Sequence, residues 1–112
     1  MTPTVEWTEE GVRLLDQLQL PGTVAYRLCR NYREVADGIR DMVVRGAPAI
    51  GVTAAMGAAL GVVQSPARSV AELRTEFAAI RATLAATRPT AVNLFWALER
   101  MQRALDAAAA GG

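Results

Sequence analysis

The chain contains no histidine and no lysine, and it has a single cysteine, Cys29. Without histidine, it can form neither a histidine-activated nucleophile nor a histidine-ligated metal site. A single cysteine excludes an internal disulfide, which suits a reducing compartment. Cys29 lies on or next to an expected strand, and we interpret it as a small buried residue rather than a nucleophile.

An excess of charge of one sign and long apolar runs are also lacking. The formal net charge is +1, so nothing in the charge balance predicts a nucleic acid, an anionic membrane or an acidic partner. Residues 49–63 are uncharged, but glycine and alanine dominate them, and a bilayer span needs about 20 apolar residues. The first residues are charged without an apolar core, so we expect no signal peptide. A chain of 112 residues predicts one domain.

Short apolar segments in the first quarter of the chain predict three β-strands between about residues 4 and 29. The segments at residues 5–7 and 12–15 flank a connection that ends in Gly11, where a positive φ is wanted, and they predict a hairpin. Such a small sheet needs helices to cover its apolar face. Alternating apolar positions indicate that the third strand is half-buried: Val24, Tyr26 and Leu28.

Helical patterns fill the rest of the chain, between about residues 32 and 108. Asn31 with Glu34, and Ser69 with Glu72, have the spacing of capping boxes at the starts of the first and third helices. We expect the first helix to run to about Val44. Glycine at position 38, inside that helix, predicts close approach of another backbone. The third helix carries a clean apolar stripe: Val70, Leu73, Phe77, Ile80 and Leu84.

The second helix, expected from Pro48 to about Gln64, has small residues on nearly every side, which places it at the centre of a bundle. Thr90 can cap a fourth helix, and we expect residues 107–112 to fray or to act as a linker. The predicted fold is therefore a small α+β domain over residues 1–112, a three-stranded antiparallel sheet followed by four helices. The apolar positions of the fourth helix are Leu94, Phe95, Leu98, Met101 and Leu105.

The segment Arg45-Gly46-Ala47-Pro48 predicts an anion site at the start of the second helix. Proline is tolerated at the first helical position, which puts Ala47 at the cap, where it has no side-chain oxygen to offer. The N–H groups of Gly46, Ala47, Ala49 and Ile50 are then left for water or a ligand, and Arg45 adds a charged donor fork. The alternative is a plain turn with a solvated arginine.

A second arginine, Arg88, precedes a proline just before the fourth helix. Proline biases the preceding residue towards an extended conformation. If the second and fourth helices begin at the same end of the bundle, Arg45 and Arg88 converge on one anion. Otherwise they are two unrelated surface arginines, and periodicity does not decide between these alternatives.

At these residues the chain resembles the amino-terminal part of the S-methyl-5-thioribose-1-phosphate isomerases. The longest matching segments are M-V-V-R-G-A-P-A-I-G at residues 42–51 and R-P-T-A-V-N-L at residues 88–94; shorter ones are L-L-D-Q at 14–17 and L-P at 20–21. The wider fold is shared by ribose-1,5-bisphosphate isomerases and by regulatory subunits of the initiation-factor nucleotide exchange complex.

The resemblance implies that Arg45, Gly46, Ala47 and Arg88 bind a sugar phosphate. In the family, a catalytic cysteine in an L-T-H-C-N context and a proton-transferring aspartate belong to a following Rossmann-like domain. Neither is present here, so we expect no catalytic residue in this chain and no activity from it in isolation. The implied reaction converts a 1-phosphorylated aldose into a ketose in methionine salvage, in the cytoplasm, without metal or organic cofactor.

The implied partners are the small-molecule sugar phosphate and the missing carboxy-terminal catalytic domain, with no nucleic acid and no membrane; a homo-oligomer is left open. The chain then represents a truncated product or one half of a split enzyme. Two alternatives remain: a non-catalytic interaction or regulatory module of the initiation-factor exchange-complex type, and a fragment of a ribose-1,5-bisphosphate isomerase.

Overall fold

The computed structural model describes residues 4–16, 22, 25–41, 43–44, 46–88 and 91–111. The strands form one antiparallel sheet in the order β1-β2-β3, and the predicted α+β class is confirmed. In chain order the elements are β1 (Val5–Thr8), β2 (Gly11–Leu15), β3 (Tyr26–Cys29), α1 (Tyr32–Arg40), α2 (Ala47–Val63), α3 (Val70–Ala85) and α4 (Val92–Gly111).

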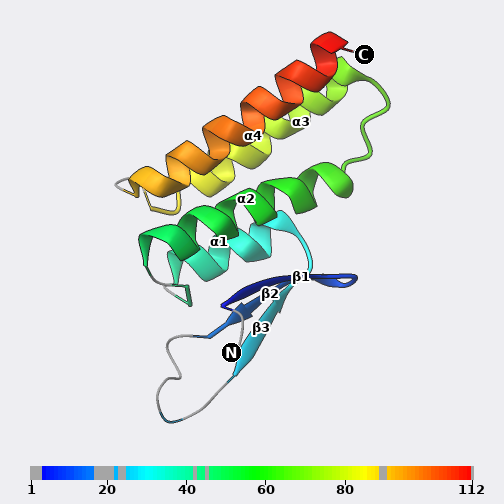
Figure 1. Ribbon diagram of the computed structural model, residues 1–112. Helices are drawn as coiled ribbons and strands as arrows, with labels where there is room; N and C mark the ends of the chain where they lie inside the picture. The colour runs from blue at the N-terminus through cyan, green and yellow to red at the C-terminus, as the bar shows by residue number, and fades with distance from the viewer. Residues whose placement is uncertain are drawn as a thin grey trace.

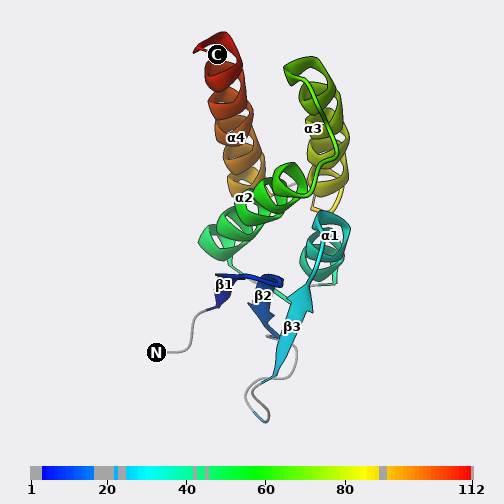
Figure 2. The same ribbon diagram turned by 90° about the vertical axis from the view of Figure 1, so that its right-hand side faces the viewer.

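The elements are stacked in layers. The sheet lies at one end, α1 and α2 cover it, and α3 and α4 lie on the far side of α2 (Figures 1 and 2). Helix α2 contacts the three other helices as well as β1 and β2, which confirms its predicted central position. A Cβ on Gly57 would lie 2.8 Å from Val35, and one on Gly61 would lie 2.7 Å from Ile80. Glycine therefore allows the neighbouring elements to pack directly against the α2 backbone.

The predicted hairpin is present, with Gly11 at a φ of +147°. The side-chain oxygen of Thr8 accepts hydrogen bonds from the N–H groups of Glu10 and Gly11, both at 3.2 Å. A Cβ at position 11 would collide with the backbone oxygen of Cys29. Glycine is thus required here both for its conformation and for the close approach of β3.

The face of the sheet that packs against the helices carries Val12, Leu14 and Cys29, each fully buried. The predicted alternation in the third strand is wrong in phase, since Tyr26 is 39% exposed. Its ring stacks instead against the Arg13 guanidinium, at 4.4 Å, an arrangement that suits an exposed aromatic. Val24 lies outside the described residues. Burial of Cys29 confirms its structural interpretation and raises the pKa of its thiol to about 11.

Two helix ends differ from expectation. Helix α1 ends at Arg40 rather than near Val44, and Val43 and Val44 are fully buried beyond it. The close neighbour of Gly38 is the side chain of Leu14, which a Cβ at position 38 would meet at 2.7 Å, and not a backbone. Helix α4 continues to Gly111, so the expected fraying is wrong up to that residue. Its last turns are rich in alanine, the strongest helix former.

Both predicted capping pairs are confirmed. Asn31 accepts a hydrogen bond from the N–H of Glu34 at 3.0 Å, and Ser69 accepts one from the N–H of Glu72 at 3.1 Å. The two glutamates bind back to the N–H groups of the residues that precede the caps, Arg30 and Arg68. In the stripe of α3, Phe77, Ile80 and Leu84 are buried, Leu73 is half-buried and Val70 is exposed.

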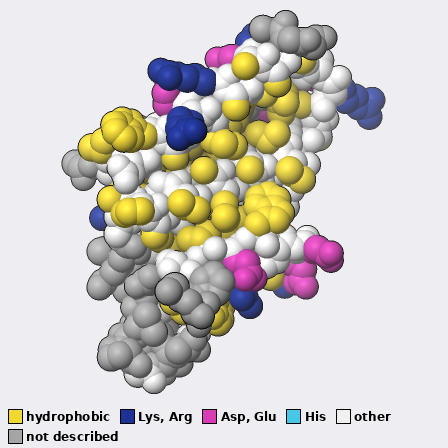
Figure 3. Space-filling view, viewed as in Figure 1, with side chains coloured by type: hydrophobic (Ala, Val, Ile, Leu, Met, Phe, Trp, Pro, Cys, Tyr) yellow, Lys and Arg dark blue, Asp and Glu magenta, His cyan; other side chains and the backbone are white. Residues whose placement is uncertain are grey.

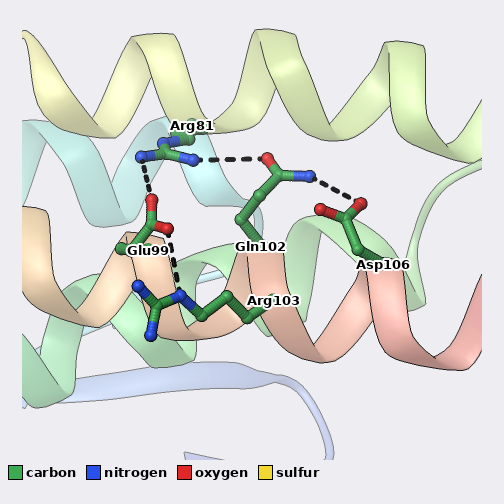
Figure 4. A network of polar contacts seen from close by, with 5 residues as sticks. All are labelled: Arg81, Glu99, Gln102, Arg103 and Asp106. Carbon is green, nitrogen blue, oxygen red and sulfur yellow. Dashed lines mark hydrogen bonds and ion pairs between the residues drawn. The ribbon is translucent and has the colours of Figure 1, made fainter.

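A polar network joins α3 to α4 (Figure 4). Arg81 contacts Glu99 at 3.0 Å, and Arg103 contacts the other oxygen of Glu99 at 3.2 Å. Hydrogen bonds from Arg81 and Arg103 lower the pKa of Glu99. Gln102 bridges Arg81 and Asp106. Because these groups are solvated, the network orients the two helices more than it stabilises them. None of the described helices is long and apolar enough to cross a membrane.

Candidate functional site

Helices α2 and α4 begin at the same end of the bundle (Figure 1), and their first turns line one cavity of about 390 Å³. The third contribution comes from the connection between α3 and α4. The condition for a shared site at the two helix starts is therefore met. The lining residues are Gly46, Ala47, Ile50, Arg88, Ala91, Val92 and Asn93.

The start of α2 has no side-chain cap. The cap position is Gly46, at a φ of +90°, rather than Ala47, so Pro48 occupies the second helical position. The N–H of Ile50 donates to the Gly46 carbonyl at 3.0 Å, and it is not free as the sequence suggested. The N–H groups of Ala47 and Ala49 belong to the first turn, where no carbonyl lies upstream in the helix to accept them. The positive end of the helix dipole adds to their attraction for an anion.

The start of α4 is built in a similar way. The carbonyl of Ala91 accepts hydrogen bonds from Leu94 at 3.1 Å and Phe95 at 3.4 Å, so the cap position is again held by a residue without a capping side chain. The N–H groups of Val92 and Asn93 lie in the first turn, which also lacks upstream acceptors. The predicted cap, Thr90, lies outside the described residues.

Arg88 is held next to this helix start by a turn in which the Ala91 N–H donates to the Arg88 carbonyl at 2.9 Å. Its side chain is half-buried. The Nη1 atom is shielded from solvent and finds no acceptor within the described part of the chain. Leaving a charged donor buried without an acceptor costs free energy. Arg88 lines the cavity, and a small turn of its side chain would let Nη1 donate to an anion there.

Asn93 belongs to the cavity although sequence reasoning gave it no role. A Cβ on Gly51 would lie 3.2 Å from the Asn93 backbone oxygen, so α2 and α4 are in near contact at this point. The small residues of α2 were the available signal, since they predicted close neighbours without saying which. Contact between Gly51 and Asn93 keeps the two uncapped helix starts together.

The structure brings three of the four predicted binding residues, Gly46, Ala47 and Arg88, to one cavity. Arg45 lies outside the described residues, and its convergence with Arg88 stays a prediction. Cys29 does not line the cavity. No group of three potential metal ligands occurs among the residues that the structure describes.

The sequence is similar to that of methylthioribose-1-phosphate isomerases. It is 59% identical to the enzyme of Koribacter versatilis over 92% of this chain and 29% of the relative. With the enzyme of Geobacter sulfurreducens the identity is 48%, over 92% of this chain and 30% of the relative. The resemblance noted from the motifs is thereby confirmed, and the chain spans less than a third of the length of these relatives.

Two solved structures share the fold. The 5-methylthioribose 1-phosphate isomerase from Pyrococcus horikoshii matches with a TM-score of 0.90 and 40% identity, over 95% of this chain and 30% of that chain. Subunit delta of translation initiation factor eIF-2B from A. fulgidus matches with a TM-score of 0.81 and 42% identity, over 94% and 30%. Residues 43–111, more than half of the sequence, match the Initiation factor 2 subunit family, and the chain therefore belongs to that family.

Proposed function

We propose that this chain is the phosphate-binding, amino-terminal domain of an aldose–ketose isomerase that converts S-methyl-5-thioribose 1-phosphate into S-methyl-5-thioribulose 1-phosphate in methionine salvage. The observation that carries the proposal is the unpartnered Nη1 of Arg88, beside a cavity that two uncapped helix starts line. A phosphate would accept from the guanidinium and from first-turn N–H groups at once. The names of the relatives supply the substrate.

The chain's part in the reaction is binding and orientation. The hydrogen moves between C1 and C2 of the sugar, whereas the phosphate group itself does not react. Binding energy from that group can hold the reacting carbons in place while other groups transfer the proton. The chain has no histidine, and its cysteine is buried with a raised pKa. The resemblance to the isomerases implies that the catalytic cysteine and the proton-transferring aspartate come from the part of the enzyme that this chain does not span.

A hybrid enzyme tests the proposal. In it, these 112 residues replace the matching part of the Koribacter versatilis isomerase, and turnover of the sugar phosphate is measured. We expect the hybrid enzyme to isomerise methylthioribose 1-phosphate and the 112-residue chain alone to be inert. Ribose 1,5-bisphosphate serves as the competing substrate. Turnover by the chain alone, or a well-folded hybrid enzyme that neither binds nor converts the sugar phosphate, would contradict the proposal.

The likeness to subunit delta of eIF-2B favours a second candidate, a non-catalytic module that docks other chains. The two functions make different demands on Arg45 and Arg88. A docking module keeps its function when either charge is removed, whereas a phosphate site does not. Unchanged sugar phosphate affinity in both Arg45→Ala and Arg88→Ala hybrids would favour the module. The free cysteine fits a cytoplasmic location for either function.

A further inference from the structure

An apolar groove runs beside the candidate site, between α2 and α4, with a volume of about 380 Å³. Its walls include two exposed apolar side chains, Val52 at 49% and Trp96 at 69%. In the space-filling view, hydrophobic side chains gather on this face over α2 and α4 (Figure 3). We call this surface the α2–α4 groove; its lining includes Pro48, Val52, Ala55, Trp96, Ala97 and Met101.

The groove is continuous with the phosphate cavity. Asn93 lines both hollows, and Pro48, which lines the groove, directly follows Ala47 of the cavity. Whatever occupies the groove therefore lies at the rim of the phosphate site. Helix α2 contributes no charged residue to either hollow, because its sequence contains none. A solvated helix face normally carries polar side chains, and their absence on the α2 side of the groove indicates a covered face. The polar residues of the groove, Asn93 and Arg100, both belong to α4.

No described element of the chain packs over the groove, although α1, α3 and the sheet cover other faces of α2. The relatives indicate an occupant for the groove. This chain matches 29–30% of their length, so more than two thirds of each relative lies outside the matched part and is available to cover this face. Val63, at 71% exposure, lies at the other end of α2 and lines neither hollow.

We propose that the α2–α4 groove is the docking surface for the remaining, proton-transferring part of the isomerase, and that docking closes the phosphate cavity along the Asn93 rim. This inference rests on the proposed function. Closure would place the reacting carbons of a bound sugar phosphate under the second part and exclude water from them. The same groove serves whether the second part follows on one polypeptide or is a separate chain.

Hydroxyl-radical footprinting with mass spectrometry tests the docking surface directly. Oxidation is compared between the 112-residue chain and the hybrid enzyme, residue by residue. We expect oxidation of Trp96 and Met101 to fall severalfold in the hybrid enzyme. Trp7 is the matched control, because it is also exposed, at 45%, but lies on β1 and lines neither hollow. Its oxidation is expected to stay the same.

Equal oxidation of Trp96 in the two proteins would overturn the docking proposal. Protection of Trp96 in the chain alone that disappears on dilution would also overturn it, since a second copy would then be the occupant. A hybrid enzyme that protects Trp96 but neither binds nor converts the sugar phosphate would support docking and contradict the proposed function. Turnover without protection of Trp96 would support the proposed function and contradict docking.

Two substitutions in the hybrid enzyme sharpen the result. Trp96→Glu places a charge in the groove, and we expect it to restore the oxidation of Met101 and to reduce turnover. Val63→Glu places the same charge at the far end of α2 and should change neither. If both variants behave like the parent, the groove is not the docking surface.

Discussion

The four helices begin in two different ways. The starts of α1 and α3 are capped by Asn31 and Ser69, whereas the starts of α2 and α4 present Gly46 and Ala91, which have no capping side chain. The two uncapped starts are also the two that share a cavity with Arg88. The first pair satisfies backbone donors with side chains, and the second pair leaves its donors without a side-chain acceptor, as the proposed phosphate site requires.

Charge follows the same division. The first turns of α1 and α3 contain Glu34 and Glu72, which neutralise the positive end of the helix dipole. The first turns of α2 and α4 contain no acidic residue. An anion would therefore meet an unopposed positive field at one pair of helix starts and a neutralised field at the other. Four predictions test this difference.

The largest expected effect comes from removing the arginine of the uncapped pair. Arg88→Ala in the hybrid enzyme should weaken sugar phosphate binding by about 1.5–3 kcal/mol, because a charged hydrogen bond is lost. Arg45→Ala should have a similar effect. Arg68→Ala is the matched control, since Arg68 is exposed beside the capped start of α3. Calorimetric titration measures the sugar phosphate affinity of all three variants. An equal loss of affinity in the Arg88 and Arg68 variants would contradict the difference between uncapped and capped helix starts.

The second-largest effect is expected from forcing the starts of α2 and α4 apart. Gly51→Ala places a methyl group 3.2 Å from the Asn93 backbone oxygen, and we expect a loss of about 1–2 kcal/mol in the free energy of unfolding because the helices are forced to shift. Gly22→Ala meets nothing within 4 Å and should change stability by less than about 0.5 kcal/mol. Denaturant unfolding compares the two variants. Equal stability would show that the close contact between Gly51 and Asn93 does not fix the distance between α2 and α4.

Capping the α4 start should exchange binding for stability. In Ala91→Asp, the carboxylate can accept first-turn N–H groups and should stabilise the chain by about 0.5–1 kcal/mol. Its negative charge should weaken phosphate binding by about 1 kcal/mol or more. Ala91→Ser separates the two effects, because it adds the acceptor without the charge. A variant that gains stability and keeps full affinity would mean that these donors do not contact the ligand.

The smallest effect is expected at the capped starts. Ser69→Ala should cost about 1 kcal/mol of stability and leave sugar phosphate affinity unchanged, since Ser69 does not line the cavity. Asn31→Ala should behave alike. Thermal unfolding gives the first quantity and titration the second. A loss of affinity in either variant would place the capped starts in the binding site as well.

The capped starts could be predicted from the sequence because each depends on residues three positions apart. The phase of β3 could not be predicted, because Tyr26 and Cys29 are both suitable strand residues. Cys29 is buried because the register of the sheet pairs it with Val12. The end of α1 was missed for a related reason: apolar residues such as Val44 are buried here outside a helix. The spacing of apolar residues indicates which side chains are buried. Tertiary packing determines whether a helix, a strand or a loop buries them.

The candidate site shows the same limit. Gly46, Ala47 and Arg88 could be selected from the sequence because each residue type indicates a local feature: glycine a turn, proline a helix start, and arginine an anion contact. The cap shifted from Ala47 to Gly46, which removed Ile50 from the set of free donors. Asn93 was missed because its place depends on the approach of α2 to α4 at Gly51, a contact between segments far apart in the chain.

The central place of α2 also bears on how the domain is made. Its partners come from both sides in sequence, with the hairpin and α1 before it and α3 and α4 after it. As the polypeptide leaves the ribosome, an uncharged helix rich in alanine and glycine emerges well before α4 can shield it. Helix α2 therefore cannot complete its native packing until α4 has emerged, and its apolar surface stays partly uncovered until then.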